Sequence, residues 1–104
     1  MMSDRESLEK IVQELQLVSQ QVATIQSQVR EIDGTLGYLT SHDSERPVYH
    51  QVGPLLVEVE DIAKLLGELK ETNEHLANHL KNLQERESEL RTSYESMTKE
   101  FGNS

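Results

Sequence analysis

The chain has 104 residues, of which only 35% are hydrophobic and 4% aromatic, and its formal net charge is −9. So few aromatic side chains cannot fill a broad globular core, which argues against a sandwich, a barrel or a doubly wound sheet. The absence of cysteine excludes a disulfide scaffold and a thiolate metal site, and the acidic balance argues against direct nucleic-acid binding.

Residues 4–40 carry an apolar repeat typical of a coiled coil. Ser3 followed by Glu6 predicts a capping box at its start, and Gly34 and Gly37 predict that the helix weakens toward its end. Alternating steps of three and four, sustained over about four heptads, predict a coiled-coil seam rather than a general amphipathic helix. The seam residues are Leu8, Ile11, Leu15, Val18, Val22, Ile25, Val29, Ile32, Leu36 and Leu39.

Residues 47–60 differ from both flanks. They contain VYHQVGPLLVEV, which combines β-branched residues, a tyrosine and alternating polarity after Pro47. This composition predicts two short strands with a turn at Val52–Leu55. Pro54 removes one donor from the strand ladder, so a bulge or a cis bond could adjust the turn, and the sequence does not choose between them.

A hairpin of two strands is marginally stable in water, and both of its edges present unpaired N–H and C=O groups. No further sheet or third helix is expected in this chain to cover the apolar side chains. We therefore expect the hairpin to join other chains by strand-to-strand addition, although an ordered apolar loop packed on the helix ends would also fit. The expected assembly residues are Val48, Tyr49, Val52, Gly53, Leu55, Leu56, Val57 and Val59.

Residues 61–101 return to the heptad pattern, and Asp61 or Glu60 could cap this second helix. The short connection predicts that the two helices form an antiparallel coiled coil with the β-hairpin between them, so that Val29 lies near Asn73. Asn73 fits either a residue that sets register and partner choice or a tolerated polar side chain. Glu87 fits a solvated edge of the seam. The seam consists of Ile62, Leu66, Leu69, Asn73, Leu76, Leu80, Leu83, Glu87, Leu90, Tyr94, Met97 and Phe101.

The middle segment also carries a short motif: Tyr49, then Val52-Gly53, then Leu55-Leu56-Val57, set between two coiled-coil helices. In this motif, and in architecture and length along nearly the whole chain, the sequence resembles the beta class of the prefoldin family. The eukaryotic subunits two and six carry close versions of the motif, and the Gly53-Pro54 step is more like subunit six. One hairpin segment is present where alpha-class chains have two.

The resemblance implies a single prefoldin-like domain over residues 1–104. It also implies that the chain is a subunit of a cytoplasmic, hetero-hexameric, ATP-independent chaperone. In such a complex the hairpins form a β-barrel platform from which the coiled coils hang as tentacles. The tentacle tips hold unfolded client proteins and pass them to a group II chaperonin. The implied partners are therefore alpha- and beta-class prefoldin subunits, unfolded proteins and the chaperonin.

By position, the tip would combine the first turns of the first helix with the last turns of the second. The second helix outlasts the seam of the first, so apolar side chains at its end would stay partly exposed, and methionine adapts to many partners. From the residues alone, Tyr94, Met97 and Phe101 fit the end of a coiled coil at least as well as they fit a client-binding surface. The expected client-binding residues are Met2, Leu8, Ile11, Val12, Tyr94, Met97 and Phe101.

No arrangement of residues predicts catalysis. His75 and His79 have the spacing of a zinc-protease helix, but Leu76 stands where the general base should be and no third ligand is evident, so we predict surface histidines. We expect no enzyme activity, no cofactor, no metal and no nucleic-acid partner. No stretch approaches about 18 consecutive apolar residues and the N-terminus lacks the apolar region of a signal peptide, so we expect no membrane association.

A second class of function remains open at this point. A structural coiled-coil adaptor that tethers defined partners, without unfolded clients, fits the heptads equally well. It fits the VYHQVGPLLV segment less well, because a plain adaptor has no need of paired strands between its helices.

Overall fold

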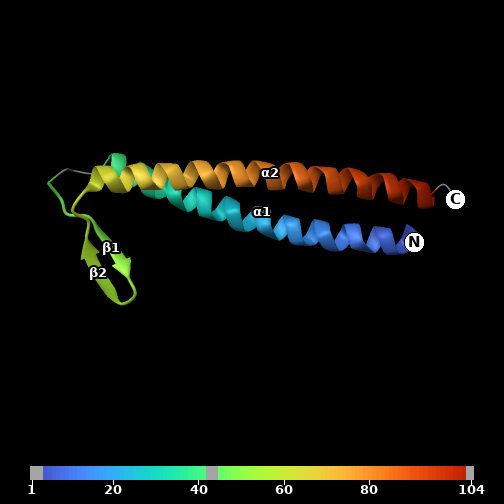
Figure 1. The fold of residues 1–104 in the computed structure, drawn as a ribbon, viewed down its shortest axis with the longest axis horizontal. Helices are drawn as coiled ribbons and strands as arrows, with labels where there is room; N and C mark the ends of the chain where they lie inside the picture. Colours follow the sequence, from blue (N-terminus) through green and yellow to red (C-terminus); the bar gives the residue numbers. More distant parts are fainter. Residues whose placement is uncertain (1–3, 42–44, 103–104) are drawn as a thin grey trace.

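The computed structural model describes residues 4–41 and 45–102, so Ser3 of the expected capping box lies outside the described residues. The elements follow in the order α1 (Asp4–Thr40), β1 (Tyr49–Val52), β2 (Leu55–Glu58) and α2 (Ile62–Gly102). Figure 1 shows the two helices side by side and antiparallel, with both chain termini at one end and the β-hairpin at the other. The molecule measures 70 × 26 × 19 Å. The predicted fold class, an antiparallel two-helix coiled coil with a β-hairpin between the helices, is confirmed.

The core of the molecule is the seam between the two helices. Every apolar seam position of α1 from Leu8 to Leu39 is buried or half-buried, and the seam of α2 is equally covered except at Tyr94 and Phe101. Apolar stripes at heptad spacing face one another in this way because the burial of each stripe requires the other. The most buried cluster consists of Val18, Val22 and Leu90, with Ile11, Leu15, Leu80 and Leu83 packed against it.

The helix ends are closed by local hydrogen bonds. The backbone N–H of Lys64 donates to Oδ1 of Asp61 at 3.0 Å, so Asp61 rather than Glu60 caps α2. At the other junction α1 continues through both glycines to Thr40, and the hydroxyl of Ser41 donates to the carbonyl oxygen of Gly37 at 3.0 Å. These contacts satisfy backbone groups that a helix end leaves without a partner inside the helix.

The hairpin has a continuous register from Tyr49 opposite Glu58 to Val52 opposite Leu55, which leaves a two-residue turn at Gly53-Pro54. Gly53 has φ +57°, in the left-handed region that glycine adopts without a steric penalty, whereas the ring of Pro54 holds its own φ negative. This combination of signs is that of a type II′ turn, which matches the twist of paired strands. The described residues contain no cis peptide bond and the pairing contains no bulge, so neither adjustment considered for Pro54 is present.

Candidate functional site

The hairpin stands clear of the helices. Neither strand packs against a helix among the described residues, and Figure 1 shows the hairpin extending away from the helical pair. All residues of β1 and β2 are exposed; Leu55 is 63% exposed and Leu56 is 71% exposed. An apolar loop packed onto the helix ends therefore does not describe this segment.

The alternation of side chains sorts the hairpin residues into two unlike faces. Because cross-strand partners share a face, Val52, Leu55 and Val57 lie together with His50. The N–H of Val59 donates to the carbonyl oxygen of Val48 at 2.7 Å, which extends the pairing and adds these two half-buried valines to the same face. One face of the ribbon is therefore almost wholly apolar.

The opposite face is mixed. Tyr49 lies across from Glu58, and Gln51 lies across from Leu56. The side-chain amide of Gln51 also donates to the carbonyl oxygen of Gly53 at 3.2 Å, which supports the turn. All eight residues predicted for assembly thus lie on the two strands, in the turn or at the strand bases, and five of them form the apolar face: Val48, Val52, Leu55, Val57 and Val59.

The predicted tip residues gather at the end of the helical pair that carries the termini. Leu8, Ile11, Val12 and Met97 are half-buried, and Tyr94 is 37% exposed. Phe101, in the last turn of α2, is 43% exposed. Met2 lies outside the described residues.

Part of this tip is hollowed. Leu8 and Val12 of α1 and Tyr94 of α2 line an open groove of about 350 Å³, together with Glu9 and Gln13. The structure brings these three predicted tip residues together on one surface, although Val12 lies off the seam.

Polar contacts join α1 to α2 within residues 4–41 and 45–102. The sequence analysis identified Asn73 alone, of the residues in these contacts, as a possible specificity residue. Nδ2 of Asn73 donates to Oδ1 of Asp33 at 2.7 Å. Oγ of Ser19 donates to Oε2 of Glu87 at 2.8 Å, and the Glu87 side chain is only 20% exposed. Glu87 is therefore a partly buried, hydrogen-bonded seam residue rather than a solvated edge.

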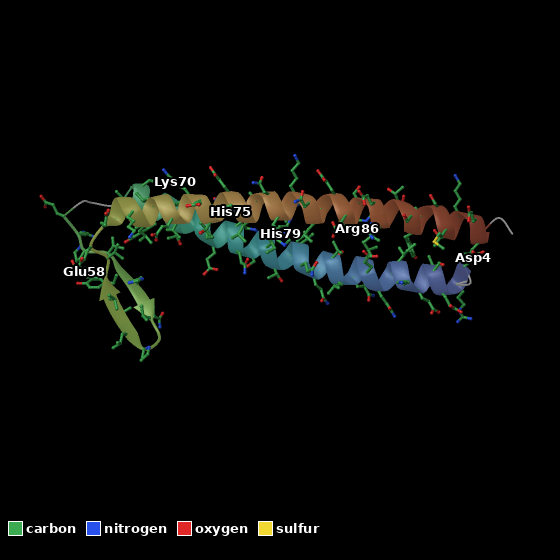
Figure 2. All side chains as sticks on the ribbon, viewed as in Figure 1. Asp4, Glu58, Lys70, His75, His79 and Arg86 are labelled. Carbon is green, nitrogen blue, oxygen red and sulfur yellow. The ribbon has the colours of Figure 1, made fainter. Side chains whose placement is uncertain are left out.

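Another contact is an ion pair on the flank of the coiled coil. Arg86 donates from Nη2 and Nε to Oε1 of Glu14 at 2.6 and 3.0 Å, and from Nη1 to Oε2 of Glu89 at 3.3 Å. Figure 2 shows Arg86 on the side of α2 that faces α1. The hydrogen bond with Glu14, and then that with Glu89, raise the pKa of Arg86 above its ordinary value.

The histidine pair of the HLANH segment lies on the exposed surface of α2 (Figure 2). Nε2 of His75 lies 3.9 Å from Oε1 of Glu71, one turn earlier. Among residues 4–41 and 45–102, no three or more His, Asp or Glu side chains are grouped so that they could hold a metal ion. In that same part of the chain, neither helix is long and apolar enough to cross a membrane.

These observations define a class of protein, an antiparallel coiled-coil subunit that carries an uncovered β-hairpin at one end and an apolar surface at the other. A family model described as "Prefoldin subunit" matches residues 5–102, which is nearly the whole chain. The chain belongs to the prefoldin family.

Relatives agree on the beta class. The prefoldin subunit beta of Archaeoglobus fulgidus is 40% identical over 86 residues, which cover 81% of this chain and 72% of that protein. The prefoldin subunit beta of Thermoplasma volcanium is 32% identical over 92 residues, covering 85% and 74%. These relatives support the beta class and do not distinguish between the eukaryotic subunit types two and six.

Solved structures share the fold. The crystal structure of the prefoldin beta subunit from Thermococcus strain KS-1 matches with a TM-score of 0.80 at 32% identity, covering 93% of this chain and 84% of that one. The prefoldin beta2 subunit of the same strain matches with a TM-score of 0.76 at 20% identity, covering 90% and 99%, and this likeness concerns the fold alone. Prefoldin is a chaperone family rather than an enzyme family, and membership implies other prefoldin subunits as partners.

Proposed function

We propose that the chain is a subunit of a hetero-oligomeric, ATP-independent holdase chaperone of the cytoplasm. In this proposal the hairpin assembles the complex with alpha- and beta-class subunits. The coiled-coil tip captures unfolded proteins, and the complex delivers them to a group II chaperonin. The exposed apolar face of the hairpin is the observation that carries the proposal, because neither helix packs over β1 or β2 among the described residues.

The assembly step follows from the chemistry of the hairpin. Among the described residues its strands are paired only with each other, so each outer edge retains backbone donors and acceptors for a further strand. Its apolar face would be buried by a second layer, at about 25 cal/mol for each Å² removed from water. A neighbouring hairpin supplies both the strand edge and the apolar layer, which a coiled-coil adaptor partner does not.

The capture step is supported by the apolar side chains at the opposite end. The groove beside Tyr94 and the exposed Phe101 offer apolar contact without a deep, shaped pocket. Such a surface suits transient binding of many unfolded segments, since little of it selects one side chain over another. The distance between tip and hairpin, along the 70 Å axis, keeps client contact separate from assembly.

The test compares two variants of the full-length chain in the reconstituted complex. Met97→Ser with Phe101→Ser removes two apolar side chains from the tip. The matched control, Leu17→Ser with Tyr38→Ser, removes two exposed apolar side chains from α1 away from the tip. We expect both variants to assemble and only the tip variant to lose suppression of the aggregation of a chemically denatured client. Full suppression by the tip variant, or an equal loss in the control, would contradict the proposal.

A further inference from the structure

The apolar seam leaves the register of the two helices weakly specified. Aliphatic side chains recur at each heptad of α1 and at nearly every heptad of α2. A slip by one heptad would therefore exchange equivalent apolar positions along most of the coiled coil, and apolar contacts would be lost only at its ends. The contacts that distinguish one register from another must be polar.

Two polar contacts cross the seam with a common offset. Asn73 donates to Asp33 at 2.7 Å, and Ser19 donates to Glu87 at 2.8 Å. Asn73 and Glu87 are two heptads apart on α2, and their partners Asp33 and Ser19 are two heptads apart on α1. Both hydrogen bonds are therefore satisfied by one and the same register.

A slip of one heptad would break both contacts at once. In one direction Asp33 would face Leu80 and Ser19 would face Tyr94. In the other direction Asp33 would face Leu66 and Ser19 would face Leu80. Asp33 is exposed, so in either slip its carboxylate stays hydrated but loses the amide donor of Asn73 and faces a leucine instead. Either slip therefore loses the Asp33–Asn73 hydrogen bond without replacing it.

The side chain of Asn73 also has a buried polar atom that lowers stability, as expected of a residue that serves specificity. Its Oδ1 is buried and has no hydrogen-bond partner within residues 4–41 and 45–102. A buried acceptor without a donor lowers stability, and a leucine at this seam position would bury apolar surface instead. A polar seam residue that lowers stability but selects one pairing is the known way in which coiled coils define register.

We infer that the Asp33–Asn73 and Ser19–Glu87 hydrogen bonds fix the register of α1 against α2. Through this register the four residues position the side chains of the tip. In this register Leu8, Val12 and Tyr94 line one groove. A slipped pairing would dismantle that groove and present a different set of side chains at the tip. Only this last step, from register to tip, rests on the proposed function.

The register can be read directly because the chain contains no cysteine. Gln16→Cys with Lys70→Cys places one nitroxide label on an exposed position of each helix, well separated along the coiled coil. Pulsed electron resonance measures the distance between the labels in full-length chain diluted with unlabelled chain. A slip of one heptad changes their axial separation by about 10 Å, at 1.5 Å per residue.

The decisive variant is Asn73→Leu with Glu87→Leu. We expect a single narrow distance with Asn73 and Glu87 in place. In the variant we expect a second population displaced by about 10 Å, together with a raised melting temperature. A higher melting temperature with one unchanged distance would overturn the inference, since the polar residues would then be merely tolerated.

Two further variants separate specificity from a general loss of polar contacts. Asp33→Asn with Asn73→Asp exchanges donor and acceptor across the helices and should keep a single distance. Glu14→Gln with Arg86→Gln removes the flanking ion pair and should also keep a single distance. A second population in either variant would count against the inference. The distance between the labels is measured without a client. The test of the register therefore gives its own result, whether or not the proposed chaperone function is correct.

Discussion

Arg86 of α2 donates two hydrogen bonds to the same carboxylate oxygen of Glu14 on α1, from Nη2 at 2.6 Å and from Nε at 3.0 Å. The contact joins the helices on their exposed flank rather than in the seam. The pair raises the pKa of Arg86 in the folded chain. A raised pKa means that the stabilisation from the charged guanidinium is lost only as the pH rises through the raised value, so it is constant around neutral pH.

The first prediction concerns the salt dependence of this ion pair. We expect Glu14→Gln to lower the melting temperature slightly at low salt, because an exposed pair contributes little. In about 1 M salt, where the Debye length is about 3 Å, the difference from the unaltered chain should largely disappear. Thermal unfolding followed by circular dichroism at both salt concentrations checks this, with Glu85→Gln as the control for a changed net charge. An undiminished difference at high salt would argue against an ionic contribution.

The second prediction concerns the start of α2. Asp61→Ala removes the carboxylate that accepts the N–H of Lys64 and should lower the free energy of unfolding by about 1 kcal/mol. Glu60→Ala, one residue earlier, removes a similar charge without removing the cap and is the matched control. Denaturant titration of both variants measures the difference. Equal losses would show that net charge, rather than capping, is responsible.

The third prediction concerns the core. Leu90 is the most buried side chain of the described residues, at 3% exposure, and packs with Val18 and Val22. Leu90→Ala should lower the free energy of unfolding by about 2–5 kcal/mol, because it removes apolar contact and leaves a cavity. Leu17→Ala removes the same atoms from an exposed position of α1 and should change stability by less than about 0.5 kcal/mol. Similar losses at the two positions would contradict the assignment of the seam.

The fourth prediction concerns the apolar face of the hairpin. Leu55→Asp introduces a charge at a side chain that is already exposed, so the helical content of the chain should not change. A buried, unpaired charge in an assembled interface is strongly unfavourable, so the complex with partner subunits should fail to form. Native mass spectrometry reads out assembly, and Leu17→Asp adds the same charge to α1 as a control. An intact complex of the Leu55→Asp chain would remove the hairpin from the assembly interface.

Much of the fold follows from local pattern. The heptad spacing predicts both helices and the faces they bury, and Val52–Leu55 is confirmed as the turn because Gly53 and Pro54 suit opposite signs of φ. The apolar face of the hairpin follows from the period of two along the strands. Such signals depend only on neighbours in the chain, so they can be recognised without knowledge of the tertiary contacts.

The contacts between the helices could not be predicted in the same way. The heptad pattern predicts Asn73 near Val29, but in the structure Asn73 hydrogen-bonds to Asp33, one turn nearer the hairpin. Side chains lean toward the N-terminus of their own helix, which for α2 lies at the hairpin end. The Ser19–Glu87 contact was missed because a serine beside a heptad seam carries no signal of its partner. The client-binding role of the tip residues stays a prediction.

We infer that this chain works as one subunit among several of its own kind, assembled through its hairpin. The most direct test is affinity capture of the full-length chain from its own cells, followed by mass spectrometry of the intact complex. We expect a discrete hetero-hexamer of small chains of similar size, which the Leu55→Asp chain does not enter. A single larger, unrelated partner at a fixed ratio would contradict it and would make the chain a coiled-coil adaptor.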